Sequence, residues 1–463
     1  MLIRNAEIAS GRCVDIRIVG DIVAQIGDVD RGPLGELTIE AKGAALLPGL
    51  HDHHFHLLAY AAARDSIRCG PPAVANGAAL ADALHHRQLA SPGAWIRGIG
   101  YHRSIAGDID RDWLDRVVTI SPARIQDRSG RLWILNSRAL EIVAPAGTGT
   151  PLEIVDGRLT GRLYDGDAWL RERIGKTVPP IRAASAFLLS RGVTGITDTT
   201  PQNGPAEFEL LRNAKAGGAL VQDLLVMGNA GLDGLTDIPG LRTGARKIHL
   251  HETGLPDLDD LSDMVRQSHR RGRPVAIHCV TLTELVFALG AFDEAGSMRG
   301  DRIEHAAVAP PDILPSMAKL GVTVVTQPNF IRERGDAYLT DVDPADRPWL
   351  YRLRGFRNAG IPLAAGTDAP FGDADPWKAM QAAVTRRTAA GAVMGEGEAL
   401  TPDEALALFT GEPDDPGGPP RVLRVGTAAD LCLIDRPWRE ACADLSDVGV
   451  EKTIKAGRIV WSR

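Results

Sequence analysis

Eight short runs rich in apolar and β-branched residues recur along the sequence, and helical patterns separate most of them. The runs are residues 44–52, 193–198, 221–227, 245–250, 274–278, 302–305, 322–326 and 362–367. Strands that are apolar on both faces and alternate with helices are typical of a parallel sheet covered by helices. Eight such units predict an α/β protein built on a (β/α)8 TIM barrel, and 463 residues accommodate one barrel with insertions.

The two ends of the chain have a different pattern. Residues 1–47 and 421–463 contain short alternating runs broken by glycine. We predict that the ends form one small β-sandwich domain, residues 1–47 and 418–463, beside a barrel at 48–417. Two unrelated β caps are the alternative. The segment of about 58–190 is too long for a simple crossover and predicts an inserted lid subdomain after the first barrel strand, with a helix at 133–143.

Charge and cysteine content limit the class of protein. Lys and Arg total 52 against 59 Asp and Glu, and the net charge of −7 argues against a nucleic-acid partner. No apolar run approaches the ~20 residues that span a bilayer, so no membrane association is expected. The five cysteines are an odd number without a CxxC pair, and residues 1–10 lack the apolar core of a signal peptide. These features predict a cytoplasmic enzyme.

The strongest chemical signal is PGLHDHHFH at residues 48–56. His54 and His56 are two residues apart, so on an extended strand both side chains point to the same face. They also end an apolar strand, and active sites of barrels form at the carboxyl ends of the strands. Two imidazoles in this arrangement can chelate one metal ion. His51 and His53 have the opposite parity, and we expect them to pack or hydrogen-bond outside the barrel.

Polar residues stand at the ends of four other predicted strands. Lys247 lies in the fourth run, His278 and His305 end the fifth and sixth, and Asp368 follows the eighth. Taken singly, each is explained as a satisfied polar group at a strand end. Because the carboxyl ends of barrel strands meet at one rim, the set as a whole predicts a metal site.

Further motifs run through nearly the whole chain. They are IRGIGY (96–101), NSRAL (136–140), GVTGITD (192–198), ARKI (245–248), AIH (276–278), RIEH (302–305), TQP (326–328), GTDAP (366–370), TRR (385–387), LTPDEALALFT (400–410) and VGTAADLCLID (425–435). Together with the histidine run, they resemble the amidohydrolase superfamily of metal-dependent hydrolases, and within it amidohydrolase family 3, the YtcJ-like branch. The resemblance implies a (β/α)8 barrel with a sandwich built from both termini.

The resemblance also implies a ligand set for two divalent metal ions, two Zn²⁺ per chain, with iron, manganese or cobalt as other options. His54 and His56 would bind the more buried ion. Lys247, carbamylated by CO₂, would bridge the two ions, and His278 and His305 would bind the second. Carbamylation is required because an unmodified lysine is protonated at neutral pH and is a poor ligand.

The same resemblance gives Asp368 two tasks, as a ligand of the buried ion and as the proton shuttle. A bound ion makes hydroxide available at neutral pH, and a carboxylate beside the water takes its proton and delivers it to the leaving nitrogen. Two alternatives to the bridged site stay open. Either Lys247 is unmodified and His249 or His251 supplies a substitute ligand, or the site holds a single metal.

Three residues are candidates for substrate contact: Tyr101 and Arg131 in the inserted segment, and Gln327 after the seventh strand. Relatives usually carry histidine where Arg131 stands, which implies altered substrate contacts. Arginines in the pocket would suit a small-molecule substrate that bears a carboxylate. A solvated basic face is the alternative. Glu304 is expected to point into the helix layer and to pair with Arg302.

These observations predict a metal-dependent hydrolase of a non-peptide C–N bond, acting on an amide, formamide or N-acyl compound through a metal-activated hydroxide. The alternative is a mononuclear heterocycle deaminase or cyclic-amide hydrolase of the same superfamily. No His-x-x-Glu follows the fifth strand, and Glu284 stands six residues after His278, which disfavours a deaminase. A scaffold protein that has lost its ligands is disfavoured because every candidate ligand is present. A homodimer is expected from the family alone.

Overall fold

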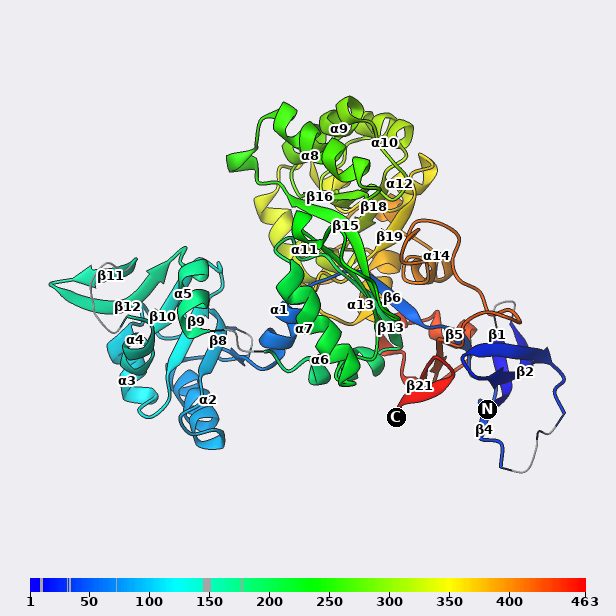
Figure 1. The fold of residues 1–463 in the computed structure, drawn as a ribbon, viewed down its shortest axis with the longest axis horizontal. Helices are drawn as coiled ribbons and strands as arrows, with labels where there is room; N and C mark the ends of the chain where they lie inside the picture. The colour runs from blue at the N-terminus through cyan, green and yellow to red at the C-terminus, as the bar shows by residue number, and fades with distance from the viewer. Residues whose placement is uncertain (9–10, 31, 33–34, 72, 145–150, 176–177) are drawn as a thin grey trace. The chain divides into compact units, whose positions relative to one another are not determined.

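The computed structural model describes residues 1–8, 11–30, 32, 35–71, 73–144, 151–175 and 178–463 (Figure 1). It divides into two compact units, one made of Met1–Leu57 with Arg182–Arg463 and the other of Leu58–Ile181. Among the residues described, no helix is both long and apolar enough to cross a membrane. All five cysteines carry free thiols.

A parallel sheet forms the centre of the first unit. Its eight strands within the described residues are, in spatial order, β19 (Leu363–Ala365), β18 (Thr323–Thr326), β17 (Arg302–His305), β16 (Val275–Cys279), β15 (Leu241–His249), β14 (Asp223–Gly228), β13 (Val193–Asp198) and β6 (Leu50–Phe55). Every neighbouring pair is parallel. Two backbone hydrogen bonds join the ends of the sheet: Asp368 N donates to His54 O at 2.8 Å, and His56 N to Ala369 O at 3.0 Å. The predicted (β/α)8 barrel is therefore confirmed.

The first barrel strand starts later than the sequence predicts. The run 44–52 divides, because β5 (Leu46–Pro48) pairs with β20 (Leu431–Ile434) in another sheet and β6 begins only after Gly49. A Cβ at Gly49 would lie 2.3 Å from Thr194 Oγ1, so glycine is required where the chain passes from one sheet to the other. Because the residues on both sides of Gly49 are apolar, the sequence alone does not indicate that the chain changes from one sheet to the other.

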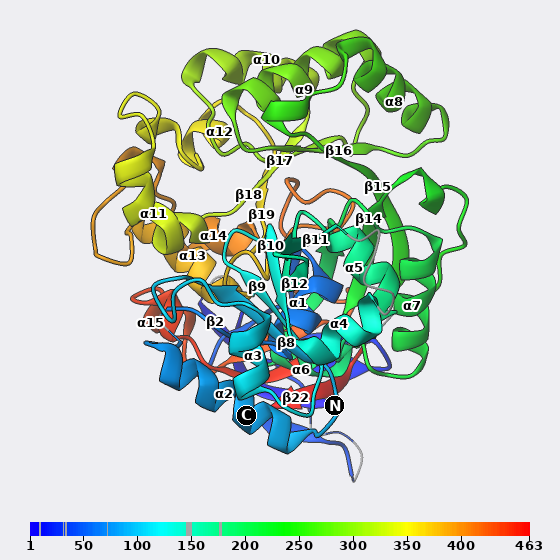
Figure 2. The same cartoon turned by 90° about the vertical axis from the view of Figure 1, so that its left-hand side faces the viewer.

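Helices cover the outside of the barrel. They are α6 (Ile181–Leu189), α7 (Pro205–Ala216), α8 (Leu258–Arg270), α9 (Leu282–Ala295), α10 (Leu314–Leu320), α11 (Asn329–Asp341), α12 (Arg354–Asn358), α13 (Pro376–Thr385) and α14 (Pro402–Ala407). Both α8 and α9 pack against β16, and with α10 they form one outer layer (Figure 2). Helix α9 begins directly after Thr281, because Thr281 and Glu284 form a capping box.

Both ends of the chain build two small sheets. One contains β1 (Leu2–Ile8), β2 (Arg12–Val19), β3 (Ile22–Gly27) and β4 (Thr38–Glu40); the other contains β5, β20, β21 (Val450–Lys455) and β22 (Arg458–Ser462). A short helix, α15 (Trp438–Ala441), lies between β20 and β21 in sequence. Buried residues of both sheets, such as Ile16, Ile18, Leu431 and Ile454, form one apolar core. The predicted sandwich from both termini is confirmed.

The second unit has its own mixed sheet and helices. The sheet contains, in spatial order, β11 (Leu152–Val155), β12 (Arg158–Tyr164), β10 (Leu132–Leu135), β9 (Ala123–Asp127), β8 (Ile96–Tyr101) and β7 (Ile67–Arg68). The helices are α2 (Gly77–Ala90), α3 (Arg111–Val117), α4 (Ser137–Val143) and α5 (Asp167–Ile174), and α1 (Leu57–Arg64) begins at the junction with the first unit.

Two boundaries in this region differ from expectation. The helix predicted at 133–143 begins only at Ser137, because residues 132–135 form β10 and Asn136 caps the helix by accepting from Ala139 N at 3.0 Å. The unit ends at Ile181 rather than near 190, since α6 belongs with the barrel, where Ser185 Oγ donates to Gln222 Oε1 at 2.6 Å.

Candidate metal centre

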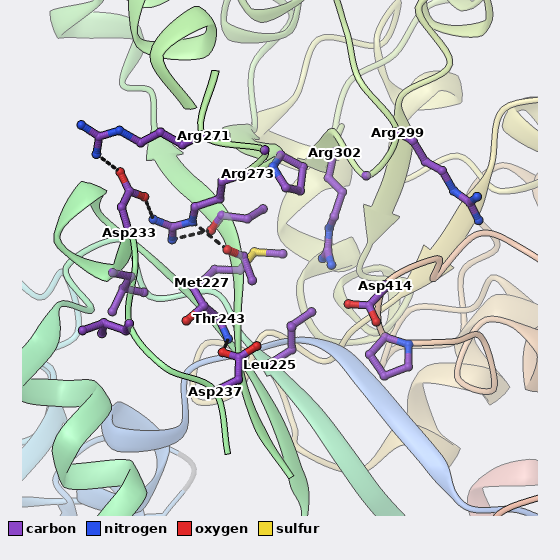
Figure 3. Close-up of a pocket in the computed structure, with 18 of the residues that line it drawn as sticks. Leu225, Met227, Asp233, Asp237, Thr243, Arg271, Arg273, Arg299, Arg302 and Asp414 are labelled. Atoms are coloured by element: carbon purple, nitrogen blue, oxygen red, sulfur yellow. Dashed lines mark hydrogen bonds and ion pairs between the residues drawn. The ribbon is translucent and has the colours of Figure 1, made fainter. Parts of the chain in front are cut away.

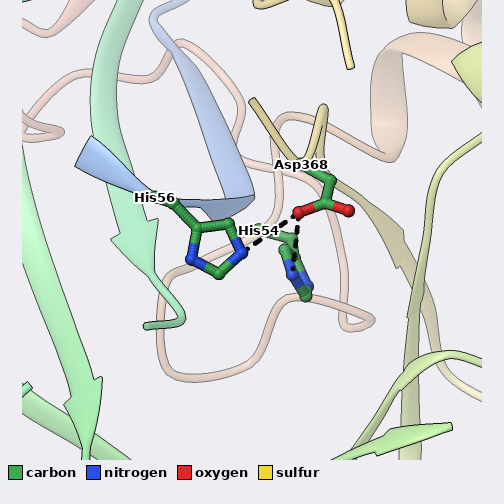
Figure 4. A group of neighbouring side chains, drawn as sticks. All are labelled: His54, His56 and Asp368. Atoms are coloured by element: carbon green, nitrogen blue, oxygen red, sulfur yellow. Dashed lines mark ion pairs between the residues drawn. The ribbon is translucent and has the colours of Figure 1, made fainter. Parts of the chain in front are cut away.

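The carboxyl ends of β6 and β19 bring three candidate ligands together (Figure 4). His56 Nε2 lies 3.1 Å and His54 Nε2 3.5 Å from Asp368 Oδ1. The approach of the two strands needs glycine at 366, because a Cβ on Gly366 would lie 2.3 Å from His54 N. Residues that the sequence places more than 300 positions apart are therefore neighbours in one group, in which His54 and Asp368 are buried and His56 is partly buried.

Glu304 contacts His54 directly, which corrects the expectation that it points into the helix layer. Its Oε2 lies 2.5 Å from His54 Nδ1, and the carboxylate is fully buried. The expected ion pair with Arg302 is present, with Nε 2.8 Å from Oε1. His305 has φ of 71°, so the alternation of β17 is interrupted and residues 304 and 305 both approach His54.

The protonation of His54 follows from this contact. Burial raises the pKa of Glu304, but the charges of Arg302 and Lys247 outweigh it and hold that pKa below its usual value. Burial lowers the pKa of His54 well below its usual value, so its ring is neutral. Because a carboxylate only accepts hydrogen bonds, the single ring proton lies on His54 Nδ1, and Nε2 carries a lone pair. That lone pair faces Asp368 Oδ1, a buried oxygen that receives no hydrogen bond among the described residues.

Two other imidazoles are also held through Nδ1. His56 Nδ1 lies 2.9 Å from Thr200 Oγ1, and His305 Nδ1 lies 2.7 Å from Gln327 Oε1. Gln327 is fully buried, and its amide oxygen is used by this hydrogen bond. Anchoring the far nitrogen of a histidine is the usual way in which proteins orient a metal ligand.

The remaining predicted ligands lie beside this group. His278 and His305, at the ends of β16 and β17, have ring centroids 4.4 Å apart, and the rings of His305 and His54 are 4.7 Å apart. Burial lowers the pKa of these three imidazoles, and the charge of Lys247, which comes from β15, lowers it further. Five of the six residues proposed from the sequence as metal ligands are therefore linked by side-chain contacts, and Lys247 acts on this group electrostatically.

Lys247 is itself poorly accommodated as an amine. It is 5% exposed, and its Nζ has no hydrogen-bond partner within the described chain. Burial lowers its pKa to about 8, against the attraction of Glu304. A buried amine without an acceptor is costly. Together, the lone pair of His54, the unbonded oxygen of Asp368 and this amine fit a centre that is completed by cations and by a carbamate on Lys247.

His249 and His251 continue the line of imidazoles away from this centre. The ring of His249 stacks on His278 at 4.0 Å and on His251 at 5.4 Å. Partial desolvation by its neighbours, together with the charge of Lys247, lowers the pKa of His249 to about 4, so its ring is neutral and has a lone pair at neutral pH. Both histidines are exposed.

The remaining histidines of the 48–56 run are buried. His51 Nε2 lies 2.9 Å from Thr197 Oγ1, and its ring is 4.5 Å from that of His53. Asp52 holds the backbone of the centre in place, because it accepts hydrogen bonds from Thr367 Oγ1 at 2.6 Å and from His54 N at 3.2 Å. It thereby ties β6 to the segment after β19.

Tyr101 and Arg131 lie in the second unit and have partners there. Tyr101 is buried, and its hydroxyl donates to Gly107 O at 2.6 Å. Arg131 makes a bidentate pair with Asp165, at 2.8 and 2.6 Å. A substrate carboxylate would therefore have to displace Asp165 from Arg131.

The sequence analysis does not predict the contact of Glu304 with His54, and it does not identify Thr200 or Phe371. Phe371 is 60% exposed although it is large and apolar, and its ring lies 5.4 Å from that of His56. Thr200 falls two residues beyond the GVTGITD motif, and Phe371 follows GTDAP directly. Thr200 and Phe371 each follow a predicted barrel strand closely, and this position in the sequence is the signal that indicates a place near the centre.

A cavity of about 880 Å³ lies at the opposite, amino-terminal end of the barrel strands (Figure 3). Its wall includes Arg273, which is buried and donates to the carbonyl oxygens of Asn229 and Gly244 and to Asp233, each at 2.8 Å. The arginine thus joins the segments around β14, β15 and β16. Active sites of barrels form at the other end, so we assign this arginine to stability.

Replacing Arg273 with alanine is expected to lower the free energy of unfolding by about 3 kcal/mol, because it strands buried acceptors. Arg299→Ala is the matched control: its side chain lines the same cavity but is 86% exposed, so the expected change is within about 0.5 kcal/mol. Urea denaturation measures both values. Equal losses for the two variants would contradict the structural role of Arg273.

Comparison with known proteins agrees with this architecture. The model of the amidohydrolase family matches residues 37–461. N-substituted formamide deformylase of Arthrobacter pascens is 26% identical, over 92% of this chain and 90% of its own. The YtcJ protein of Bacillus subtilis is 24% identical, with the same coverage. The crystal structure of a metal-dependent hydrolase from Pyrococcus furiosus has a TM-score of 0.76 at 21% identity, covering 94% of this chain and 98% of that one.

Proposed function

This chain belongs to the amidohydrolase family, in its YtcJ-like branch, and we propose that it hydrolyses a non-peptide C–N bond with divalent metal at the carboxyl end of its barrel. The observation that carries this proposal is the lone pair of His54 Nε2 facing Asp368 Oδ1 at 3.5 Å. Two electron-rich atoms are stable in this position when a cation lies between them. The buried, unpartnered Nζ of Lys247 supports the same conclusion.

The proposed ligands follow from the cluster. His54, His56 and Asp368 would hold one Zn²⁺, His278 and His305 would hold a second, and Lys247, once carbamylated, would supply a ligand to both. Iron, manganese and cobalt suit the same donors. Bound metal lowers the pKa of a coordinated water to about 7 and polarises the substrate carbonyl. Asp368 takes the proton of the attacking water and delivers it to the departing nitrogen.

The substrate is proposed to be a formamide or other N-acyl compound, as the name of the Arthrobacter relative suggests. The exposed ring of Phe371 beside His56 offers an apolar surface for a substituent on the nitrogen. A carboxylate on the substrate is a further option that depends on Arg131. We also propose that the enzyme acts in the cytoplasm, which accords with its free thiols.

Heterocycle deamination is the second candidate, and the structure gives it less support. A deaminase of this kind needs a glutamate near the fifth strand as a second proton carrier. Glu284 accepts from Val280 N at 2.7 Å, from Thr281 N at 3.1 Å and from Glu252 N at 2.9 Å. Both of its oxygens are thus used to hold backbone, one at the start of α9 and the other in the segment that follows β15.

The first test is the metal content of protein purified without chelator, measured by inductively coupled plasma mass spectrometry. We expect about two equivalents per chain. The loaded protein would then be screened against N-formyl and N-acyl amines, with and without a carboxylate, and against amino-heterocycles. About one equivalent together with heterocycle turnover would favour the deaminase. No metal after reconstitution would overturn the proposal.

A further inference from the structure

The three anchored imidazoles of the centre differ in the charge of their partners. His56 is held by a threonine hydroxyl and His305 by a glutamine amide, both of which are neutral. His54 alone is held by a carboxylate, at the shortest of the three distances, 2.5 Å. A charged acceptor makes a stronger hydrogen bond to Nδ1–H than a neutral one and increases the electron density on the ring.

Arg302 holds the carboxylate of Glu304 in this position. Arg302 lies 2.8 Å from Oε1 through its Nε, and its Nη2 donates to His53 O at 2.7 Å. Both side chains are almost completely buried. Arg302 thus binds the carboxylate that holds His54 and also the peptide that precedes His54, so the ring is fixed relative to its own backbone.

We propose that Glu304 is a positioning residue that fixes the Nδ1–H tautomer of His54 and makes it the strongest neutral ligand of the centre. Arg302 is the residue that holds Glu304 in place. Metal held by His54, His56 and Asp368 is therefore bound more tightly than metal held by His278 and His305. This inference rests on the proposed function, because it assumes that these residues bind metal.

The test replaces Glu304 with glutamine, which keeps the size of the side chain and removes its charge. Metal-free protein would be titrated with Zn²⁺ in competition with a chromogenic chelator. We expect the tighter of the two sites to lose about 10- to 100-fold in affinity, with a smaller change at the weaker site. Glu398→Gln is the matched control, because Glu398 is also buried and paired with an arginine, Arg352, at 2.8 Å, in a pair that does not contact a histidine.

A second measurement avoids the possibility that Glu304→Gln fails to fold. Nitrogen-15 spectra of histidine-labelled, metal-free wild-type protein report the tautomer of each ring, and His54→Asn identifies the His54 signals. We expect Nδ1–H for His54. The Nε2–H tautomer, or unchanged affinity at both sites in Glu304→Gln, would overturn the role of Glu304. Failure of the wild-type protein to bind Zn²⁺ would instead overturn the proposed function. The tautomer of His54 would then still test whether Glu304 accepts the hydrogen bond from His54 Nδ1.

Discussion

Asp368→Asn is expected to lower turnover by about 10²- to 10⁴-fold while leaving the fold intact, because asparagine fills the same space but takes no proton. Asp368 is 5% exposed, and its Oδ1 lies 3.1 Å from His56 Nε2. No lysine or arginine neutralises it through an ion pair in the described residues. The measurement is kcat on the substrate found in the screen, with thermal unfolding followed by circular dichroism.

Asp375→Asn provides the control on the same connection between β19 and α13. Asp375 is also buried, but its carboxylate accepts from Trp377 N at 3.1 Å and pairs with Arg191 at 3.3 Å. Its replacement is expected to cost stability and to leave kcat within a few-fold. Metal content separates the two tasks of Asp368: full metal with lost turnover identifies proton transfer, and lost metal identifies ligation. Near-normal turnover with full metal would remove Asp368 from the proton pathway.

The parts of the centre that sequence reasoning predicts are those fixed by local periodicity. His54 and His56 share a face because side chains alternate along a strand, and His278 was found because it ends an apolar run. Because the strands of a barrel all end at one rim, these residues can be predicted to be neighbours even though no distance between them is known. Each of these inferences needs only a few consecutive residues, which a single sequence supplies.

The parts that it misses depend on contacts between distant segments. Glu304 and His305 both approach His54 because the φ of 71° at His305 interrupts the alternation of the strand, which the letters RIEH do not indicate. Likewise, the run 44–52 divides between two sheets at Gly49. Thr194, which lies in a strand 145 positions further along the chain, leaves no room there for a side chain. Local patterns therefore locate the strands, whereas the partner that fixes each ligand is visible only in three dimensions.

Lys247→Ala is expected to abolish activity and to remove about one of two metal equivalents, because the side chain proposed to become the bridging carbamate is lost. The substitution also removes a buried amine that lacks a hydrogen-bond partner, so stability should rise or stay constant in metal-free protein. Short carboxylic acids that occupy the vacated space are expected to restore part of both activity and metal content. Wild-type protein equilibrated with carbon-13 bicarbonate should show one carbamate signal that Lys247→Ala lacks.

Lys215→Ala distinguishes a bridge from a general effect of losing a buried lysine. Lys215 Nζ donates to Gln222 O at 2.7 Å and lies 3.8 Å from Asp223, so its loss should lower stability without changing metal content or responding to carboxylic acids. If Lys247→Ala keeps both metals, His249 is the ligand to replace next, since its neutral ring already stacks on His278 at 4.0 Å. Full activity of Lys247→Ala, with no carbamate signal in the wild-type protein, would exclude the bridged centre and leave a site built on His54, His56 and Asp368 alone.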